Sequence, residues 1–173
     1  MIALAPTPIL RTQRLTLRAP IATDWPGIRD FMASPRSRWA GGPLDRRNAW
    51  RLFGSFVGHW VLRDYGLFVY HRHDDPTPLG TVGPYRPEGW PEPEIGWTLW
   101  DPASEGQGYA TEAARKTLAY ARDTLRWASA VSYISSANTA SIAVAERLGA
   151  SFDPAATPNH DGALVYRHWG QAQ

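Results

Sequence analysis

The segment from Glu94 to Ala121 constrains the fold of this chain more than any other part of its sequence. Glu94–Trp100 is typical of a strand, a short loop with Gly106 and Gly108 follows, and a helical pattern begins near Tyr109. The first amides of a helix lack internal partners, and the aligned peptide dipoles place partial positive charge there. Glycines let such a backbone wrap closely around phosphate oxygens. The segment therefore predicts a strand–turn–helix unit able to hold a diphosphate.

The two glycines alone are a weak signal, because such a pair before a helix more often forms only a turn. The dinucleotide-binding fingerprint is incomplete, since Thr111 stands where its third glycine is needed. No Gly-Lys-Ser/Thr sequence supports a P-loop, and no Gly-x-Ser-x-Gly elbow is present. An ordinary turn and a phosphate-binding turn both remain open on this evidence.

Hydrophobic periodicity predicts the elements that precede this segment. Arg14–Arg18 alternates polar and apolar residues, as a half-buried strand does. Thr23 or Asp24 can cap a helix that ends at Ser34-Pro35, and Asp45 can cap a longer helix closed by Gly66. The apolar residues expected on the buried face of the longer helix are Trp50, Phe53, Val57, Trp60 and Val61.

The remaining elements complete an α+β pattern. Strands are expected at Leu67–Tyr70, Pro78–Gly83, Ala130–Ser135 and Leu164–Tyr166, and a helix at Asn138–Leu148, stopped by Gly149. The order β-α-α-β-β-β-α-β-α-β predicts a sheet of mixed strand direction with helices on both faces. No internal boundary is evident, so a single domain over residues 1–173 is expected.

Composition excludes several classes of protein. The chain has no cysteine, which rules out disulfides, a thiolate nucleophile and cysteine-bound metal. Its formal charge is only +2 and its arginines are scattered, which argues against nucleic-acid binding. No apolar run approaches the roughly 20 residues that span a bilayer. Met1–Pro6 does not resemble a signal peptide, so we expect a cytoplasmic protein without a membrane partner.

Three separated motifs make the sequence resemble a known superfamily. They are Glu94-Ile95-Gly96-Trp97, Gly106-Gln107-Gly108-Tyr109-Ala110-Thr111-Glu112-Ala113, and Asn138-Thr139-Ala140-Ser141 with Glu146-Arg147-Leu148-Gly149. In this order they resemble the GNAT superfamily of acyl-CoA N-acyltransferases. The opening Leu10–Arg18 is also similar to the branch of ribosomal-protein N-terminal acetyltransferases (RimJ/RimL-like). The likeness runs from about residue 9 to residue 168.

The resemblance implies a GNAT fold whose central sheet is splayed between the strand ending at Trp100 and the strand beginning near Ala130. Acetyl-CoA would be the acyl donor, with its pantetheine arm in the split, its diphosphate on the glycine-containing turn and its far end near Asn138. The cofactor-binding residues implied in this way are Thr98, Leu99, Trp100, Gln107, Gly108, Tyr109, Ala110, Thr111, Asn138 and Ser141.

The sequence departs from the superfamily pattern in two places. Glu105 replaces the Arg or Gln that usually opens the phosphate loop, and its carboxylate would repel a diphosphate unless it points to solvent, as we expect. Ala145 replaces the tyrosine that often serves as general acid. Ser141 is then the candidate acid, as in the RimL-like branch.

Glu94 is the candidate general base, because it lies on the strand that lines the expected cleft. Its alternative role is a strand-end carboxylate paired with an arginine, and Glu92 is a lesser candidate base. We interpret Glu112 as structural, because acids favour the first turn of a helix. Asn138 has the alternative role of a helix N-cap.

Two further groups of side chains have alternative interpretations. His71-x-His73 resembles part of a metal site, but a polar strand end explains it, and no metal is expected. Trp39, Tyr85 and Trp90 lie in loops and either pack in the core or line the acceptor pocket.

The predicted activity is acetyl transfer from acetyl-CoA to a primary amine, by direct attack in a ternary complex. The acceptor is either a protein N-terminus or a small-molecule amine, and the protein either a monomer or a homodimer. One alternative is a non-catalytic acyl-CoA-binding sensor module of the same fold. A nucleotide-binding regulator is a third possibility, which would bind ATP or NAD in a way that CoA does not displace.

Overall fold

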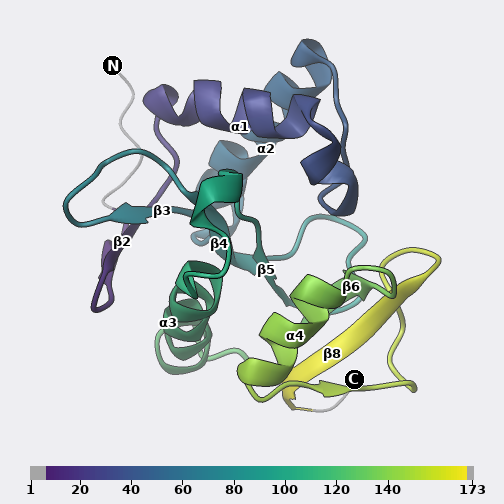
Figure 1. Cartoon of the computed structure of the whole chain (residues 1–173). Helices are drawn as coiled ribbons and strands as arrows, with labels where there is room; N and C mark the ends of the chain where they lie inside the picture. The colour runs from purple at the N-terminus through teal and green to yellow at the C-terminus, as the bar shows by residue number, and fades with distance from the viewer. Residues whose placement is uncertain (1–6, 171–173) are drawn as a thin grey trace.

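The computed structural model describes residues 7–170, so Met1–Pro6, which we expected not to be a signal peptide, lies outside the described residues. Within this range one mixed sheet of eight strands has the order β1-β2-β3-β4-β5-β6-β8-β7 (Figure 1). Among the described strands, only β5 and β6 pair in parallel. The strands are β1 (Leu10–Arg11), β2 (Leu15–Arg18), β3 (Phe68–Arg72), β4 (Gly80–Tyr85), β5 (Glu94–Trp97), β6 (Ala130–Ser135), β7 (Ser151–Phe152) and β8 (Ala163–Trp169).

Helices cover both faces of the sheet, which confirms the predicted α+β fold with a mixed sheet. The helices are α1 (Trp25–Ala33), α2 (Arg46–Arg63), α3 (Tyr109–Asp123) and α4 (Thr139–Arg147). Helices α1 and α2 pack together over Val69 on one face. On the other face α3 packs over Phe68 and Tyr70, and α4 lies next to α3 over β6 (Figure 1).

Helix α2 begins as predicted, but its buried face and its end differ from the prediction. Asp45 caps it by accepting a hydrogen bond from the Asn48 amide at 2.8 Å. The buried face comprises Ala49, Phe53, Phe56, His59 and Trp60. The predicted buried face was displaced around the helix axis relative to this one: Trp50 and Val61, both expected to be buried, are 55% and 61% exposed. Asp64, in the left-handed conformation with φ 60°, ends the helix in place of Gly66.

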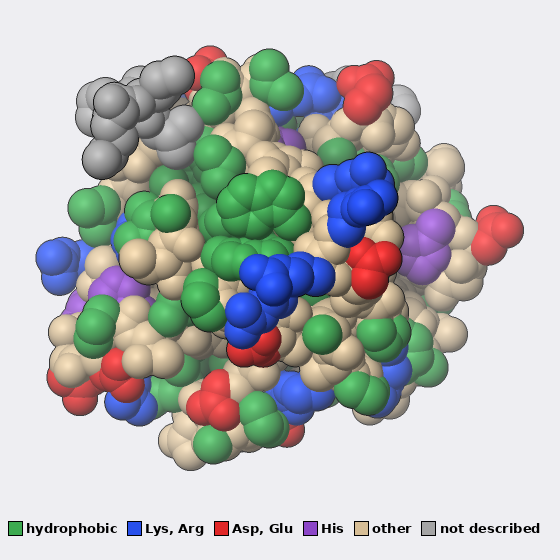
Figure 2. All heavy atoms as spheres, turned by 90° about the horizontal axis from the view of Figure 1, so that it is seen from above, with side chains coloured by type: hydrophobic (Ala, Val, Ile, Leu, Met, Phe, Trp, Pro, Cys, Tyr) green, Lys and Arg blue, Asp and Glu red, His purple; other side chains and the backbone are tan. Residues whose placement is uncertain are grey.

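The outward face of α1 and α2 carries a group of apolar side chains bordered by charged ones (Figure 2). Trp50 belongs to this outer layer, where its ring packs edge-on against Trp25 with centroids 5.0 Å apart. The tryptophan expected in the core is therefore a surface residue, because its partner ring lies on α1 and not in the sheet.

The sheet separates where β5 and β6 meet, as the resemblance implied. Regular pairing of these strands is limited to Glu94 with Val131. On its other side the β5 chain stays bonded to β4 beyond Trp97: the Thr98 amide donates to Thr81 at 2.7 Å, and the Trp100 amide to Leu79 at 2.8 Å. The strand predicted to reach Trp100 is therefore paired along only one edge. Its other edge opens into a cleft.

Candidate active site

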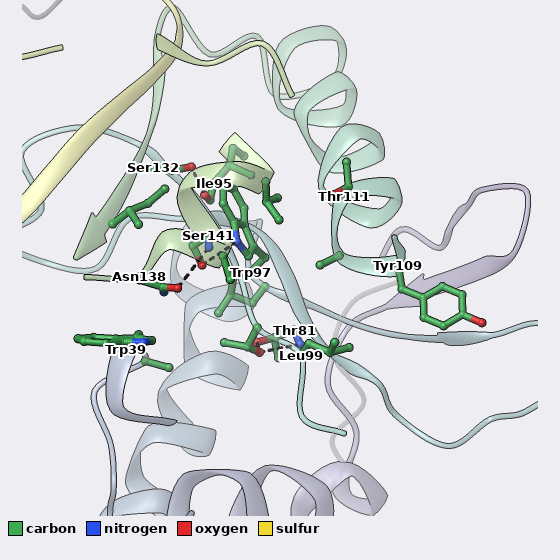
Figure 3. Close-up of a pocket in the computed structure, with 18 of the residues that line it drawn as sticks. Trp39, Thr81, Ile95, Trp97, Leu99, Tyr109, Thr111, Ser132, Asn138 and Ser141 are labelled. Atoms are coloured by element: carbon green, nitrogen blue, oxygen red, sulfur yellow. Dashed lines mark hydrogen bonds between the residues drawn. The ribbon is translucent and has the colours of Figure 1, made fainter. Parts of the chain in front are cut away.

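A cleft of about 1390 Å³ occupies the split in the sheet. It is lined by β5, β6, the start of α3, the start of α4 and the short 3-10 helix Pro35–Trp39 (Figure 3). Most of the predicted site residues lie in its lining, while Trp100 is buried beside it and Gln107 lies outside it. The predicted residues in the lining are Glu94, Thr98, Leu99, Gly108, Tyr109, Ala110, Thr111, Asn138 and Ser141.

The glycine-containing turn presents unpaired amides to this cleft. Gly106 and Gly108 have φ values of 74° and 78°, in the left-handed region where glycine is free of Cβ strain. The Glu105 amide donates to Pro102 at 3.2 Å, and the next amide with a partner is that of Glu112, which donates to Gly108 at 3.0 Å. Within residues 7–170, the amides from 106 to 111 have no protein acceptor. The turn can therefore bind an anion without breaking a bond of the fold.

Arg36 compensates the charge of Glu105 at this turn. The Glu105 side chain is 59% exposed, as expected, and its Oε1 accepts a hydrogen bond from Arg36 Nη1 at 2.6 Å. The same guanidinium donates to the carbonyl of Leu99 at 3.2 Å and to that of Trp100 at 3.3 Å. Arg36 thus joins the 3-10 helix to both the strand edge and the phosphate turn.

Two other arginines in the lining escaped the sequence analysis. Arg115 projects from α3 and Arg147 from the end of α4, and Arg115 Nη2 donates to the Arg147 carbonyl at 3.3 Å. Neither forms an ion pair within the part of the chain that the structure describes. Arg115 gave a weak signal because α3 carries several basic residues, and Arg147 entered the sequence analysis only as part of the Glu146-Arg147-Leu148-Gly149 motif. Together they make this end of the cleft positive.

The strand edge at the split offers one free amide. Thr98 and Trp100 direct their amides to β4, and the Thr98 carbonyl accepts the hydroxyl of Tyr70 at 2.8 Å. Because hydrogen-bonding direction alternates along a strand, the Leu99 amide faces the split, and it has no acceptor among the described residues. Of the three predicted positions, Leu99 is the one whose amide a ligand can reach.

Asn138 and Ser141 lie together at the start of α4. Asn138 is the N-cap: its Oδ1 accepts a hydrogen bond from the Ser141 amide at 3.2 Å, which leaves its amide NH₂ group free. The Ser141 Oγ accepts the indole N–H of Trp97 at 3.3 Å and keeps its own proton available (Figure 3). Ala145 is fully buried in the packing of α4 against β6 and presents no group to the cleft.

Glu94 lies at the start of β5 and lines the cleft. Its Oε2 accepts the Trp90 indole N–H at 2.6 Å, and it forms no ion pair among the described residues. Burial raises the pKa of Glu94 to about 7, and the Trp90 hydrogen bond opposes that rise only in part. The arginine-paired alternative thus does not describe Glu94.

The other acids in this region have structural partners. Glu92 accepts two hydrogen bonds from Arg167, both at 2.8 Å, and this ion pair lowers the pKa of Glu92. Glu112 accepts the Arg14 Nε at 2.7 Å and the Thr12 hydroxyl, which ties α3 to the start of the sheet. These contacts leave Glu94 as the free acid of the cleft.

Aromatic residues from three loops and strands reach the same cleft. Trp39, Tyr85 and Trp90, the three candidates for the acceptor pocket, all line it. The His71-x-His73 pair faces elsewhere, and His73 is bonded to Thr16 Oγ1 at 2.9 Å. No group of three or more potential metal ligands occurs within residues 7–170. No helix in that range is long and apolar enough to cross a membrane.

A splayed mixed sheet with an open amide turn beside the split defines an acetyltransferase of the GNAT class. A sequence model of the acetyltransferase (GNAT) domain matches residues 14–151, and the chain belongs to this family. GNAT acetyltransferases generally transfer acetyl groups from acetyl-CoA.

Solved structures agree with this assignment. An acetyltransferase from Agrobacterium tumefaciens str. C58 is 39% identical, with 99% of each chain covered and a TM-score of 0.89. A ribosomal L7/L12 alpha-N-protein acetyltransferase, RimL, solved with coenzyme A, is 19% identical over 96% of this chain and 100% of that one, with a TM-score of 0.71. An aminoglycoside acetyltransferase solved with coenzyme A is 17% identical over 88% and 92%, with a TM-score of 0.72. The latter two share the fold.

Proposed function

We propose that this protein transfers the acetyl group of acetyl-CoA to a primary amine by direct attack in a ternary complex, in the cytoplasm. One observation carries the proposal: the turn at residues 106–111, whose amides have no protein acceptor among the described residues, and the Glu94 carboxyl, which forms no ion pair there, lie at one cleft. The first group suits a diphosphate, and the second suits the removal of a proton from an amine. The opening motif Leu10–Arg18 supports placement in the RimJ/RimL-like branch.

The acyl donor fits the cleft from the phosphate turn to the split. The amides of Gln107, Gly108, Tyr109, Ala110 and Thr111 would hold the diphosphate. Arg115 and Arg147 add positive charge beside them. The pantetheine arm would lie along the free strand edge, as an added strand lies along a sheet edge, with its thioester end at the Leu99 amide. Asn138 would contact the donor through its free amide group.

Three groups would then act on the acetyl transfer. Glu94, partly ionised at neutral pH because its pKa is about 7, removes the proton from the attacking amine. The Leu99 amide stabilises the oxyanion. Ser141 would relay a proton to the departing thiolate, with its hydroxyl donating to the sulfur and regaining a proton from solvent. The chain has no cysteine, so no acyl-thiol intermediate can form on it.

Turnover of acetyl-CoA against a panel of amines and peptides tests the proposal. Glu94→Gln should lower turnover about 100-fold, with partial recovery at higher pH as more of the amine becomes neutral. Glu88→Gln is the matched control, because the Glu88 side chain is 99% exposed and outside the cleft. The wild-type rate should rise with pH through about 7 as Glu94 ionises. A Glu94→Gln profile equal to wild type would remove Glu94 from the mechanism.

The second candidate, a non-catalytic acyl-CoA-binding module, is favoured by the burial of Ala145 at the usual position of the acid. Calorimetry with CoA, run beside the turnover assay, separates the two functions. Tight CoA binding without turnover of any acceptor would favour the module and contradict the enzyme.

A further inference from the structure

Three aromatic side chains enclose Glu94. Tyr85 is its cross-strand neighbour in the β4–β5 register, and Trp90 donates to its carboxyl. The Trp90 ring packs edge-on against Tyr85, with centroids 6.2 Å apart, and against Tyr133, with centroids 6.5 Å apart. All three rings line the cleft. A substrate therefore reaches the Glu94 carboxyl by passing the flat apolar faces of these three rings.

The free polar atoms at this end of the cleft accept hydrogen bonds. Among the described residues Glu94 forms no ion pair, and Asn159, in the loop before β8, has a buried Oδ1 without a hydrogen-bond partner. Both residues line the cleft. A guest that satisfies them must bring hydrogen-bond donors, and a primary amine supplies such donors.

The lining holds basic side chains such as Arg38 and His160 as well as acids, and the acids limit the charge that a guest can carry beside its amine. A carboxylate next to the amine would lie close to the carboxyl of Glu94 and be repelled as that group ionises. A second ammonium group would need a second free acid. The other acids in the described lining are Glu105 and Glu112, which are already paired with Arg36 and Arg14.

We propose that the acceptor is a primary monoamine with a flat, apolar body and no carboxylate beside its nitrogen. This inference rests on the proposed acetyl transfer to an amine. The aromatic rings around Glu94 hold the body of the acceptor, and the carboxyl receives its nitrogen. An arylalkylamine and a protein N-terminus that begins with an aromatic residue share this chemistry.

A panel of acceptor amines tests the proposal. Tryptamine and a peptide that begins with Trp, has a free N-terminus and is amidated at its C-terminus should each show kcat/KM at least about tenfold above that of tryptophan, which adds a carboxylate, and of putrescine, which has a second cation and no aromatic ring. A higher kcat/KM for tryptamine identifies the acceptor as a small molecule, and a higher value for the peptide identifies it as a protein N-terminus. Tryptophan or putrescine equal to both would overturn the inference while leaving acetyl transfer intact. Loss of turnover on every amine would instead contradict the proposed function.

Two variants locate the binding of the apolar body. Tyr133→Leu should raise the KM for tryptamine about tenfold, whereas Tyr133→Phe, which keeps the ring, should not. Trp39→Ala provides a second test that spares the core, because Trp39 lines the cleft and is 44% exposed. Its matched control is Trp50→Ala, which lies outside the cleft. The Kd for CoA should stay unchanged in all four variants. An unchanged KM in both Tyr133→Leu and Trp39→Ala would overturn the proposal.

Discussion

At the scale of single residues, Glu94 differs from the other acids around it. Glu92, Glu105 and Glu112 each form an ion pair with an arginine. Glu94 has an indole N–H as its partner and aromatic neighbours, so burial keeps its pKa near 7. A poised acid of this kind serves proton transfer at neutral pH, and it costs stability whenever it is ionised.

This cost gives a stability prediction for Glu94→Gln. The folded pKa of about 7 lies above the ordinary value of 4.5, so the stabilisation from the protonated form is complete below 4.5 and lost as pH rises through about 7. Glutamine does not ionise, and its Oε1 can still accept the Trp90 hydrogen bond. The Tm of the variant relative to wild type should therefore rise between about pH 5 and about pH 8.5, by about 2–4 °C for each 1 kcal/mol.

Thermal unfolding at the two pH values checks this difference. Comparing the variant with wild type at each pH removes the contribution of groups that titrate independently of Glu94. Glu88→Gln should show a constant difference from wild type, because its side chain is in solvent. A Glu94→Gln difference that does not change with pH would mean that Glu94 has an ordinary pKa.

At the scale of elements, the turn before α3 depends on backbone conformation more than on side-chain space. Gly108 has φ 78°, and a Cβ added there would meet only Arg14 Nη2, at 3.7 Å. A larger residue would therefore fit sterically but strain the backbone. The conformation that turns the amides of residues 106–111 towards the cleft is what such a residue would disturb.

Gly108→Val should weaken CoA binding about tenfold or more, because the strained turn no longer presents its amides together. Gly149→Val is the matched control: Gly149 has φ 87°, no atom within 4 Å of an added Cβ, and a place outside the cleft after α4. Both variants should lose stability by about 1–2 kcal/mol. Calorimetry should show near wild-type CoA affinity for Gly149→Val alone. Equal affinity in the two folded variants would argue against a phosphate site at this turn.

At the scale of the whole molecule, the sequence predicted the order and class of the elements because their hydrophobic patterns repeat over several residues. The two-residue strands β1 and β7 were missed, since they exist only through pairing with a neighbour. Contacts between residues far apart in the sequence could not be predicted either. Arg36 and Glu105 are 69 residues apart, and no local pattern indicates that they meet. The direction of the Glu94 side chain likewise depends on the register of β4 and β5.

The split divides the sheet into two parts that have few direct bonds. Besides the Glu94–Val131 pairing, Ser132 Oγ on β6 donates to the Ile95 carbonyl on β5 at 2.6 Å. Because the Ser132 proton is used there, His168 on β8 must donate from Nε2 at 2.9 Å, which fixes its neutral tautomer. Burial lowers the pKa of His168 to about 4, so its ring is neutral at neutral pH. Past the Ser132–Ile95 bond, the free strand edge at Leu99 can gain hydrogen-bond partners only from a ligand.

A ligand that fills the split should therefore stabilise the whole molecule. CoA at 100 times its Kd should add about 2.7 kcal/mol, or about 5–10 °C in Tm for a chain of this length. Adenosine 5′-diphosphate 3′-phosphate keeps the diphosphate but has no pantetheine arm, so in hydrogen exchange it should protect the start of α3 but not Leu99, whereas CoA should protect both. A flat Tm with CoA would contradict the donor site, because a ligand bound only to the folded state must raise it. Protection of Leu99 by the short ligand would instead place the pantetheine arm elsewhere.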